Sequence, residues 1–281
     1  MKVVFSFIFL VTFSLCTQAQ EKLIVWDKIY QREYLRNFLQ MALNHTEEGK
    51  QYQLVPSIAL EQGDAFDYLT QGNIDIFISA ADKNRESSSL PIFVPTDRGL
   101  LGFRLCFTQK SNPIFEQIRS VDAMIKLDFS FGVGSDWPDL GIYQQNAIKT
   151  VSDKINSNLT AMIIDEKFDC YSRSVYEIDE ELHLYEGTDI IVDENLLFIY
   201  PNAEFIYINP HKSEVHAILL QGIDAMLKDD TYFTYFDDNY ADVLRNHGIY
   251  DRKLIFLENN QLSEQAIDAV NRFGVATFIQ N

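Results

Sequence analysis

Hydrophobic residues along the first hundred positions follow two alternating periods. Short runs rich in β-branched residues are typical of strands, and the segments between them place apolar residues at helical spacing. We expect strands at 22–27, 52–60 and 74–80, and helices at 34–45 and 64–72. Such alternation predicts a mostly parallel sheet with helices on its faces.

The same alternation then begins again further along the chain. The expected strands are 100–110, 129–134, 167–173 and 194–209. The expected helices are 113–126, one from 138, 159–166, 213–228 and 231–246. No linker rich in Pro, Gly or Ser and no sequence repeat separates the parts. Two α/β lobes joined by extended strands therefore fit the pattern better than one continuous sheet.

The first nineteen residues have the pattern of a cleaved secretory signal. Lys2 supplies a basic start, an apolar run covers 3–15, and small or polar residues lead to Ala19. The apolar run is shorter than the roughly 20 residues that a membrane-spanning helix needs. We therefore expect residues 1–19 to be removed and the mature chain to begin near Gln20, in the periplasm.

The charge of the chain excludes one class of partner. It has 23 Lys and Arg against 41 Asp and Glu, a formal net charge of -18. Nucleic acids and anionic membranes attract basic surfaces, so neither is expected as a partner. No Cys/His cluster has metal-ligand spacing, and no cofactor is expected. Cys106 and Cys170 are too few for a disulfide framework, which favours two buried free thiols.

The segment FGVGSDWPDLGIYQQN, residues 131–146, predicts a strand that stops on glycines and then opens a helix. The strand would end at Gly134, with Ser135 or Asp136 as the helix cap and a proline in the first turn. Exposed N–H groups and the positive end of the helix dipole suit an anion at such a corner. An ordinary capped helix with Trp137 as a lid on the core explains the same residues.

The order of these elements resembles the type II periplasmic solute-binding proteins, in particular family 3, the polar amino-acid binders of ABC importers. The segment GLLGFRLCFTQKSNP at 99–113 is similar to the strand that crosses between the lobes of that family. The segment 203–240, with an aromatic-rich strand, a helix and a D-x-x-Y ending, is similar to the return. A less characterised branch of transporter substrate-binding domains has a similar SDWPD corner and a strand like FDCYSR.

The resemblance implies a two-lobed α/β fold with a central ligand cleft. Lobe 1 would comprise 20–105 and 204–281, and lobe 2 would comprise 106–203, with two extended crossings between them. Such proteins close on a ligand that both lobes touch. We therefore expect a monomer that closes on a small anionic or amino-acid-like ligand.

The resemblance also implies a set of ligand-binding residues. Arg85 matches the arginine that grips the ligand carboxylate, although the Thr of the family's turn is absent here. Gly134 and Ser135 match the loop that holds the same carboxylate. Arg173 stands near the place of the aspartate that binds the ligand ammonium, which favours a ligand with two acidic ends or no free amine. Alternatively, Arg173 pairs with a nearby carboxylate such as Glu177.

Two tryptophans and three charged residues complete the expectations for the cleft. Trp26 ends the first strand, where sheets of this type present side chains to the crevice, and core packing is an equal alternative. Trp137 is expected at the cleft wall, and Asp136 is expected to cap its own helix. Arg98 and Arg104 flank the crossing strand and are expected to form salt bridges at the hinge.

Three functions fit these residues. The first is a solute-binding protein that serves a membrane permease, and the second is an orphan sensor that serves a signalling protein. The third is a small-molecule lyase or dehydratase on the same fold. The sequence contains no Gly-x-Ser-x-Gly elbow, His-Glu-x-x-His helix or phosphate loop, which disfavours an enzyme.

Overall fold

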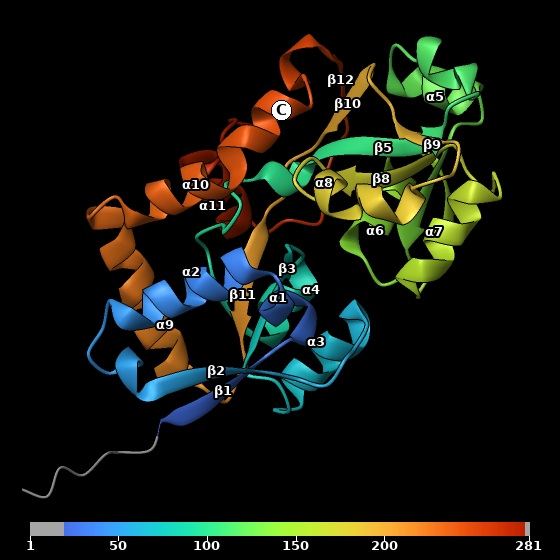
Figure 1. Cartoon of the computed structure of the whole chain (residues 1–281). Coiled ribbons are helices and arrows are strands. Elements are labelled where there is room, and N and C mark those ends of the chain that lie inside the picture. Colours follow the sequence, from blue (N-terminus) through green and yellow to red (C-terminus); the bar gives the residue numbers. More distant parts are fainter. Residues whose placement is uncertain (1–19, 279–281) are drawn as a thin grey trace, which may run out of the picture.

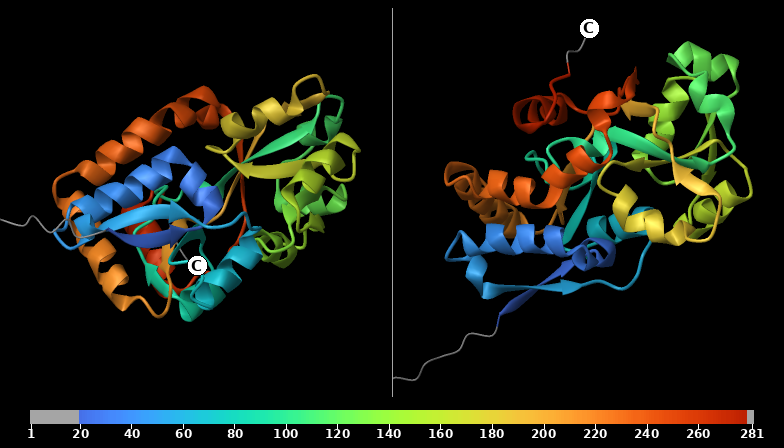
Figure 2. Two further views of the ribbon diagram at one scale, coloured as in Figure 1. Left: turned by 60° about the horizontal axis from the view of Figure 1, so that its bottom comes forward. Right: turned by 45° about the horizontal axis from the view of Figure 1, so that its top comes forward.

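The structure is a computed structural model that describes residues 20–278. The expected signal segment, residues 1–19, lies outside the described residues. Within 20–278, no helix combines the length and the apolar character that crossing a membrane requires. Figures 1 and 2 show the described chain as two α/β bodies, each built on its own sheet.

The first lobe contains a five-stranded sheet in the order β2-β1-β3-β11-β4. Its strands are β1 (Glu21–Val25), β2 (Tyr52–Pro56), β3 (Ile76–Ala80), β4 (Leu90–Ile92) and β11 (Glu204–Ile208). β1 runs parallel to β2 and β3, as the alternation predicts. β11 returns from the far part of the sequence and runs antiparallel to β3 and β4.

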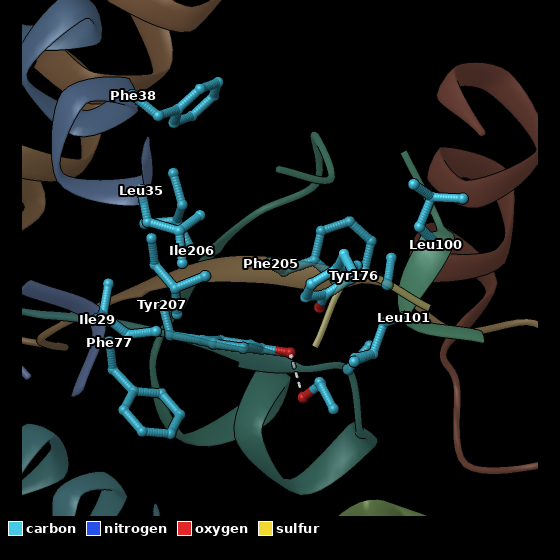
Figure 3. Packing of buried hydrophobic residues seen from close by; sticks show 14 of the residues in the cluster. Ile29, Leu35, Phe38, Phe77, Leu100, Leu101, Tyr176, Phe205, Ile206 and Tyr207 are labelled. Atoms are coloured by element: carbon cyan, nitrogen blue, oxygen red, sulfur yellow. Dashed lines mark hydrogen bonds between the residues drawn. The ribbon is translucent and has the colours of Figure 1, made fainter. Parts of the chain in front are cut away.

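Helices cover this sheet with apolar faces. They are α1 (Asp27–Gln31), α2 (Glu33–Asn44), α3 (Gln62–Thr70), α4 (Lys83–Ser88), α9 (Ser213–Lys228) and α10 (Thr231–Asn246), with the 3-10 turn η1 (Gly49–Gln51) after α2. α2 and α9 approach closely, since a Cβ on Gly222 would lie 1.9 Å from the carbonyl oxygen of Ala42. Figure 3 shows Leu35 and Phe38 of α2 on the side of the core where Ile206 of β11 lies.

The second lobe contains a seven-stranded sheet with the path β12-β10-β5-β8-β6-β7, and β9 pairs with β5 beside this path. Its strands are β5 (Phe103–Gln109), β6 (Ser130–Gly134), β7 (Lys149–Asp153), β8 (Cys170–Ser174), β9 (Ile190–Val192), β10 (Leu196–Ile199) and β12 (Lys253–Phe256). Its helices are α5 (Val121–Lys126), α6 (Pro138–Gln145), α7 (Asn156–Ile164) and α8 (Ile178–Glu181), with the 3-10 turns η3 (Pro113–Glu116) and η4 (Leu182–Tyr185).

The C-terminal part of the chain contributes to both lobes. α9 and α10 pack on the first lobe, whereas β12 pairs in parallel with β10 of the second sheet. η5 (Ile249–Asp251) leads into β12, and α11 (Glu264–Phe273) follows it. The chain therefore returns to the second sheet before β12, in addition to the two expected crossings after β4 and β10. The turn η2 (Leu100–Gly102) lies at the first of these crossings.

Cys106 and Cys170 form a disulfide, which corrects the expectation of two free thiols. The cysteines lie on the antiparallel neighbours β5 and β8, where Cys106 is opposite Ser172. Their Cα atoms are 5.0 Å apart, a separation that a disulfide spans. The bond links the crossing strand to the strand that carries Arg173.

Candidate ligand-binding cleft

A cavity of about 90 Å³ lies between the two lobes. Side chains from both lobes line it. The first lobe contributes Trp26, Lys28, Arg32, Ser79 and Glu204, and the second contributes Arg104, Trp137, Asp139, Arg173 and Glu177. Trp26 directly follows β1, and Ser79 lies near the end of β3, so the cavity lies at the carboxyl ends of the parallel strands.

Three arginines surround the carboxylate of Glu177. Its Oε1 lies 2.8 Å from Nη2 of Arg173 and 3.3 Å from Nη2 of Arg32, and its Oε2 lies 3.7 Å from Nη1 of Arg104. Burial raises the pKa of Glu177, but the three arginines outweigh it and lower the pKa to about 2. Arg32 comes from the first lobe, so this ionised cluster joins the lobes beside the cavity.

Arg173 faces the cavity and also forms ion pairs, which combines the two alternatives that the sequence left open. Besides Glu177, it binds Glu181, with Nη2 2.5 Å from Oε1 and Nε 2.9 Å from Oε2. Its guanidinium lies 4.9 Å from the ring centroid of Trp137. Within residues 20–278, no hydrogen bond uses its Nη1. One donor of Arg173 is therefore available to a ligand.

Arg104 forms the expected ion pair, but it also lines the cavity. The side chain is 2% exposed, and its Nη2 lies 2.5 Å from Oδ1 of Asp139. The hydroxyl group of Tyr200 donates to the same oxygen. Nε of Arg104 is buried and has no hydrogen-bond partner among the described residues. This nitrogen is a second donor that the protein leaves unused.

Arg98 does not form the salt bridge that was expected of it at the hinge. Its Nε donates to the carbonyl oxygen of Phe273 at 2.8 Å, and its guanidinium lies over Phe236. The neighbouring Asp97 is turned inward, where it accepts hydrogen bonds from the N–H groups of Leu101 and Glu204. Arg98 thus binds a carbonyl oxygen and an aromatic ring, and within 20–278 it has no carboxylate partner.

Arg85 is buried beside the cleft and does not line the cavity. Its Nη1 donates to the hydroxyl of Ser79 at 2.8 Å and to the carbonyl oxygen of Ala80 at 2.9 Å. Its Nε lies 3.1 Å from Oδ2 of Asp82, and its Nη2 donates to the carbonyl oxygen of Asp136 at 3.3 Å. Each of its three nitrogens therefore already binds the protein, and one of these bonds crosses to the second lobe.

Asp136 does not cap its own helix, contrary to expectation. Trp137 is the N-cap residue of α6 and makes no side-chain cap bond. Oδ2 of Asp136 instead accepts a hydrogen bond from the N–H of Gly63, 2.6 Å away in the first turn of α3. The carboxylate thus occupies a helix N-terminus of the opposite lobe, which is a favourable place for negative charge.

The backbone of the glycine corner is largely used within the protein. The N–H of Ser135 donates to Asp153, and the N–H of Trp137 donates to Gly134. Ser135 is exposed, and neither it nor Gly134 lines the cavity, whereas Trp137 does. A Cβ on Gly134 would lie 2.4 Å from the indole of Trp137, so glycine allows the ring to pack over the strand end.

Trp26 combines both roles that its position suggested. It lines the cavity, and its side chain is almost fully buried. Its indole N–H donates to the carbonyl oxygen of Leu60 at 3.1 Å, and its ring stacks on Phe77 with centroids 4.9 Å apart. The hydrogen bond and the stacking fix the orientation of this wall of the cavity.

Arg32 and Glu204 are two of the cavity residues that the sequence patterns did not single out. Oε1 of Glu204 lies 3.4 Å from Nη1 of Arg32, and Oε2 is buried without a partner in the described structure. Burial raises the pKa of Glu204 to about 8, since Asp97 and Glu177 add to the effect while Arg32 opposes it. The sequence gives little sign of their role. Arg32 is a single arginine shortly after the first strand, and Glu204 is a single acid at the start of the aromatic strand of 203–209.

The part of the chain that the structure describes contains no group of three or more His, Cys, Asp or Glu side chains that could hold a metal ion.

No family model matches the sequence, and no curated protein sequence is recognisably similar to it. Solved structures are similar in fold at low identity. An ancestral arginine-binding protein bound to arginine is 11% identical, with a TM-score of 0.60, covering 79% of this chain and 99% of that one. The ancestral amino acid-binding protein AncCDT-1, a precursor of cyclohexadienyl dehydratase, is 14% identical, with a TM-score of 0.56 and coverage of 78% and 95%.

The cysteine-binding protein from Campylobacter jejuni is 13% identical, with a TM-score of 0.52, covering 80% of this chain and 90% of that one. These likenesses extend over nearly the whole of each solved chain. The protein therefore has the two-lobed α/β fold of the type II periplasmic solute-binding proteins, as the order of elements predicts.

Proposed function

We propose that the protein is an extracytoplasmic solute-binding protein that captures a small ligand with an anionic group between its lobes. The fold supports this role, since the similar structures include substrate-binding proteins of amino-acid ABC transporters. The secretory pattern at the N-terminus supports the location. A membrane permease is then the partner that receives the ligand.

The observation that carries the proposal is Arg173 at the cavity wall. Its guanidinium lies over Trp137, and its Nη1 makes no hydrogen bond within the described residues. The cavity lining contains four basic side chains, Lys28, Arg32, Arg104 and Arg173, against the three acidic side chains Asp139, Glu177 and Glu204. In a chain with a net charge of -18, the guanidinium nitrogens of Arg104 and Arg173 that make no hydrogen bond within 20–278 favour an anionic ligand.

Isothermal titration against small carboxylic acids, amino acids and short peptides tests the proposal. A charge-assisted hydrogen bond is worth roughly 1.5–3 kcal/mol, so Arg173→Ala should weaken binding about ten- to a hundredfold. Arg173→Lys should recover only part of the affinity, because an ammonium group cannot reproduce the planar fork of the guanidinium. Arg119→Ala, at an exposed arginine outside the cavity, is the matched control. Undiminished binding by Arg173→Ala would contradict the proposal.

The ligand of a solute-binding protein is cargo that leaves unchanged. Mass spectrometry of the identified ligand after incubation with the protein should therefore recover it intact. Formation of a dehydrated product would favour the lyase alternative. A sensor kinase gene beside this one, in place of a permease gene, would favour the orphan sensor.

A further inference from the structure

Glu204 brings to the cavity a carboxyl group that the protein leaves partly unused. The residue begins β11 of the first sheet and is 4% exposed. Its Oε1 lies 3.4 Å from Nη1 of Arg32, whereas its Oε2 is buried without a hydrogen-bond partner in the structure of 20–278. A buried oxygen without a partner is unfavourable, so a ligand group that reaches Oε2 recovers a lost hydrogen bond.

The opposite wall presents unused donors. Nε of Arg104 is buried without a partner among residues 20–278, and Nη1 of Arg173 makes no hydrogen bond there. Guanidinium N–H groups bind carboxylates more strongly than they bind neutral acceptors. The second lobe therefore offers a place for a carboxylate, and the first lobe offers a place for a second polar group.

The guanidinium of Arg32 lies between the carboxylate place in the second lobe and the place beside Glu204. Nη1 of Arg32 contacts Glu204, and its Nη2 lies 3.3 Å from Oε1 of Glu177. Glu177 in turn contacts both Arg104 and Arg173. The two ends of the site are thus joined by a short chain of contacts, and the cavity of about 90 Å³ accommodates only a small molecule.

The place beside Glu204 suits a polar group other than an ammonium. An ammonium needs an ionised carboxylate, yet Glu177 and Asp139 each already bind arginine, at 2.8 Å and 2.5 Å. Titratable groups from three parts of the chain face Glu204. Arg32 and Tyr34 come from the start of α2, and Asp97 comes from the loop before η2. Tyr176 and Glu177 come from the segment before α8. Burial raises the pKa of Glu204 to about 8, and Asp97 and Glu177 add to this shift, whereas Arg32 and the hydroxyl group of Tyr176 oppose it. The folded protein therefore favours the protonated carboxyl group. A neutral carboxyl group both donates and accepts, which suits a hydroxyl group.

Building on the proposed function, we infer that the ligand is a small hydroxycarboxylic acid. Arg104 and Arg173 hold its carboxylate, and Glu204 binds its hydroxyl group. Glu204 is then the residue that separates hydroxy acids from amino acids of the same shape.

Calorimetric titration at pH 7 with matched pairs tests this inference, because the two members of a pair differ only in hydroxyl against ammonium. The pairs are glycolate and glycine, L-lactate and L-alanine, and L-malate and L-aspartate. The hydroxy acid should bind about tenfold more tightly in at least one pair, the effect expected of one matched hydrogen bond with the unneeded charge removed. In no pair should the amino acid bind more tightly.

Glu204→Gln is the decisive variant, because the neutral amide keeps the size of the side chain and its ability to donate and accept. It should keep the affinity for the hydroxy acid within about threefold, while Glu204→Ala should lose about tenfold. Glu33→Gln makes the same replacement at an exposed position outside the cavity and should leave binding unchanged. A native thermal transition of each variant shows that it is folded before it is titrated.

Tighter binding of the amino acids, or a hundredfold loss for Glu204→Gln, would overturn this inference and leave the proposed function standing. If neither member of any pair binds, the inference is also overturned. The proposed function then falls only if the dicarboxylates and peptides of the wider panel fail as well.

Discussion

Oδ2 of Asp136 in the second lobe accepts a hydrogen bond from the backbone N–H of Gly63 in the first lobe, at 2.6 Å. The carbonyl oxygen of the same aspartate accepts from Nη2 of Arg85 at 3.3 Å. A Cβ on Gly63 would lie 2.9 Å from Oδ2 of Asp136, so the two segments are in close contact. The lobes are thus joined at one corner of the cleft by contacts that need no ligand.

This corner contact leads to a prediction for the free protein. Asp136→Ala removes the charge-assisted bond to Gly63, which is worth roughly 1.5–3 kcal/mol, and should shift the lobes toward an open form. Small-angle scattering without ligand should show a larger radius of gyration than for the wild type. Asp165→Ala, at an exposed aspartate outside the cleft, is the control. Identical scattering of all three proteins would show that the contact does not hold the lobes together.

Glu204 leads to a prediction for stability against pH. Burial raises its pKa from 4.5 to about 8, so between these values the native state holds a proton that the unfolded state releases. The free energy of unfolding should therefore fall as the pH rises from about 4.5 to 8. Asp97, whose pKa burial raises from 3.8 to about 6, acts in the same direction over the lower part of this range.

Glu204→Gln has no proton to hold, so its stability should fall less over that range. Urea unfolding at intervals between pH 5 and pH 8 measures the difference, with Glu33→Gln as the control. Equal slopes for the wild type and Glu204→Gln would mean that Glu204 is ionised in the native protein. Glu177 contributes at a different pH, because its lowered pKa of about 2 gives stability that is lost only as the pH falls from 4.5 through 2.

The disulfide leads to a prediction for unfolding. It closes a loop with a sequence separation of 64 residues, for which the chain-entropy estimate of stabilisation is about 4 kcal/mol. A variant with both Cys106→Ala and Cys170→Ala should lose stability of this order, measured by urea unfolding. The unfolded wild-type chain from Gln20 onward should show free thiols only after reduction. Two free thiols before reduction would contradict the disulfide between β5 and β8.

The sequence predicts best those elements in which the apolar repeat continues over many residues. The helices at 213–228 and 231–246 have the bounds that the pattern predicts, because sixteen residues give several turns of evidence for one apolar face. α4 was missed because its residues, KNRESS, are polar, and it begins at Asp82, whose side chain accepts from the N–H groups of Asn84 and Arg85. β12 was missed because four residues at a sheet edge are too few to show an alternating apolar pattern.

The cleft was harder to predict than the fold, since its residues come together only through pairing between distant strands. Trp26, Trp137 and Arg173 lie at strand ends or at the corner after a strand, where side chains reach a crevice, and all three line the cavity. Arg32 and Glu204 are 172 positions apart in the sequence, and the return of β11 to the first sheet brings them into contact. No local pattern around either residue contains that information.

Tryptophan fluorescence can show whether the ligand binds between the lobes, in the cavity beside Arg173. The chain has only two tryptophans, Trp26 and Trp137, and both line this cavity from opposite lobes. Trp26→Phe and Trp137→Phe therefore leave one reporter on each wall. With a ligand identified by calorimetry, both variants should show saturable changes that give the same dissociation constant. A ligand that binds by calorimetry while leaving the fluorescence of both variants unchanged would place the site elsewhere and contradict binding in this cavity.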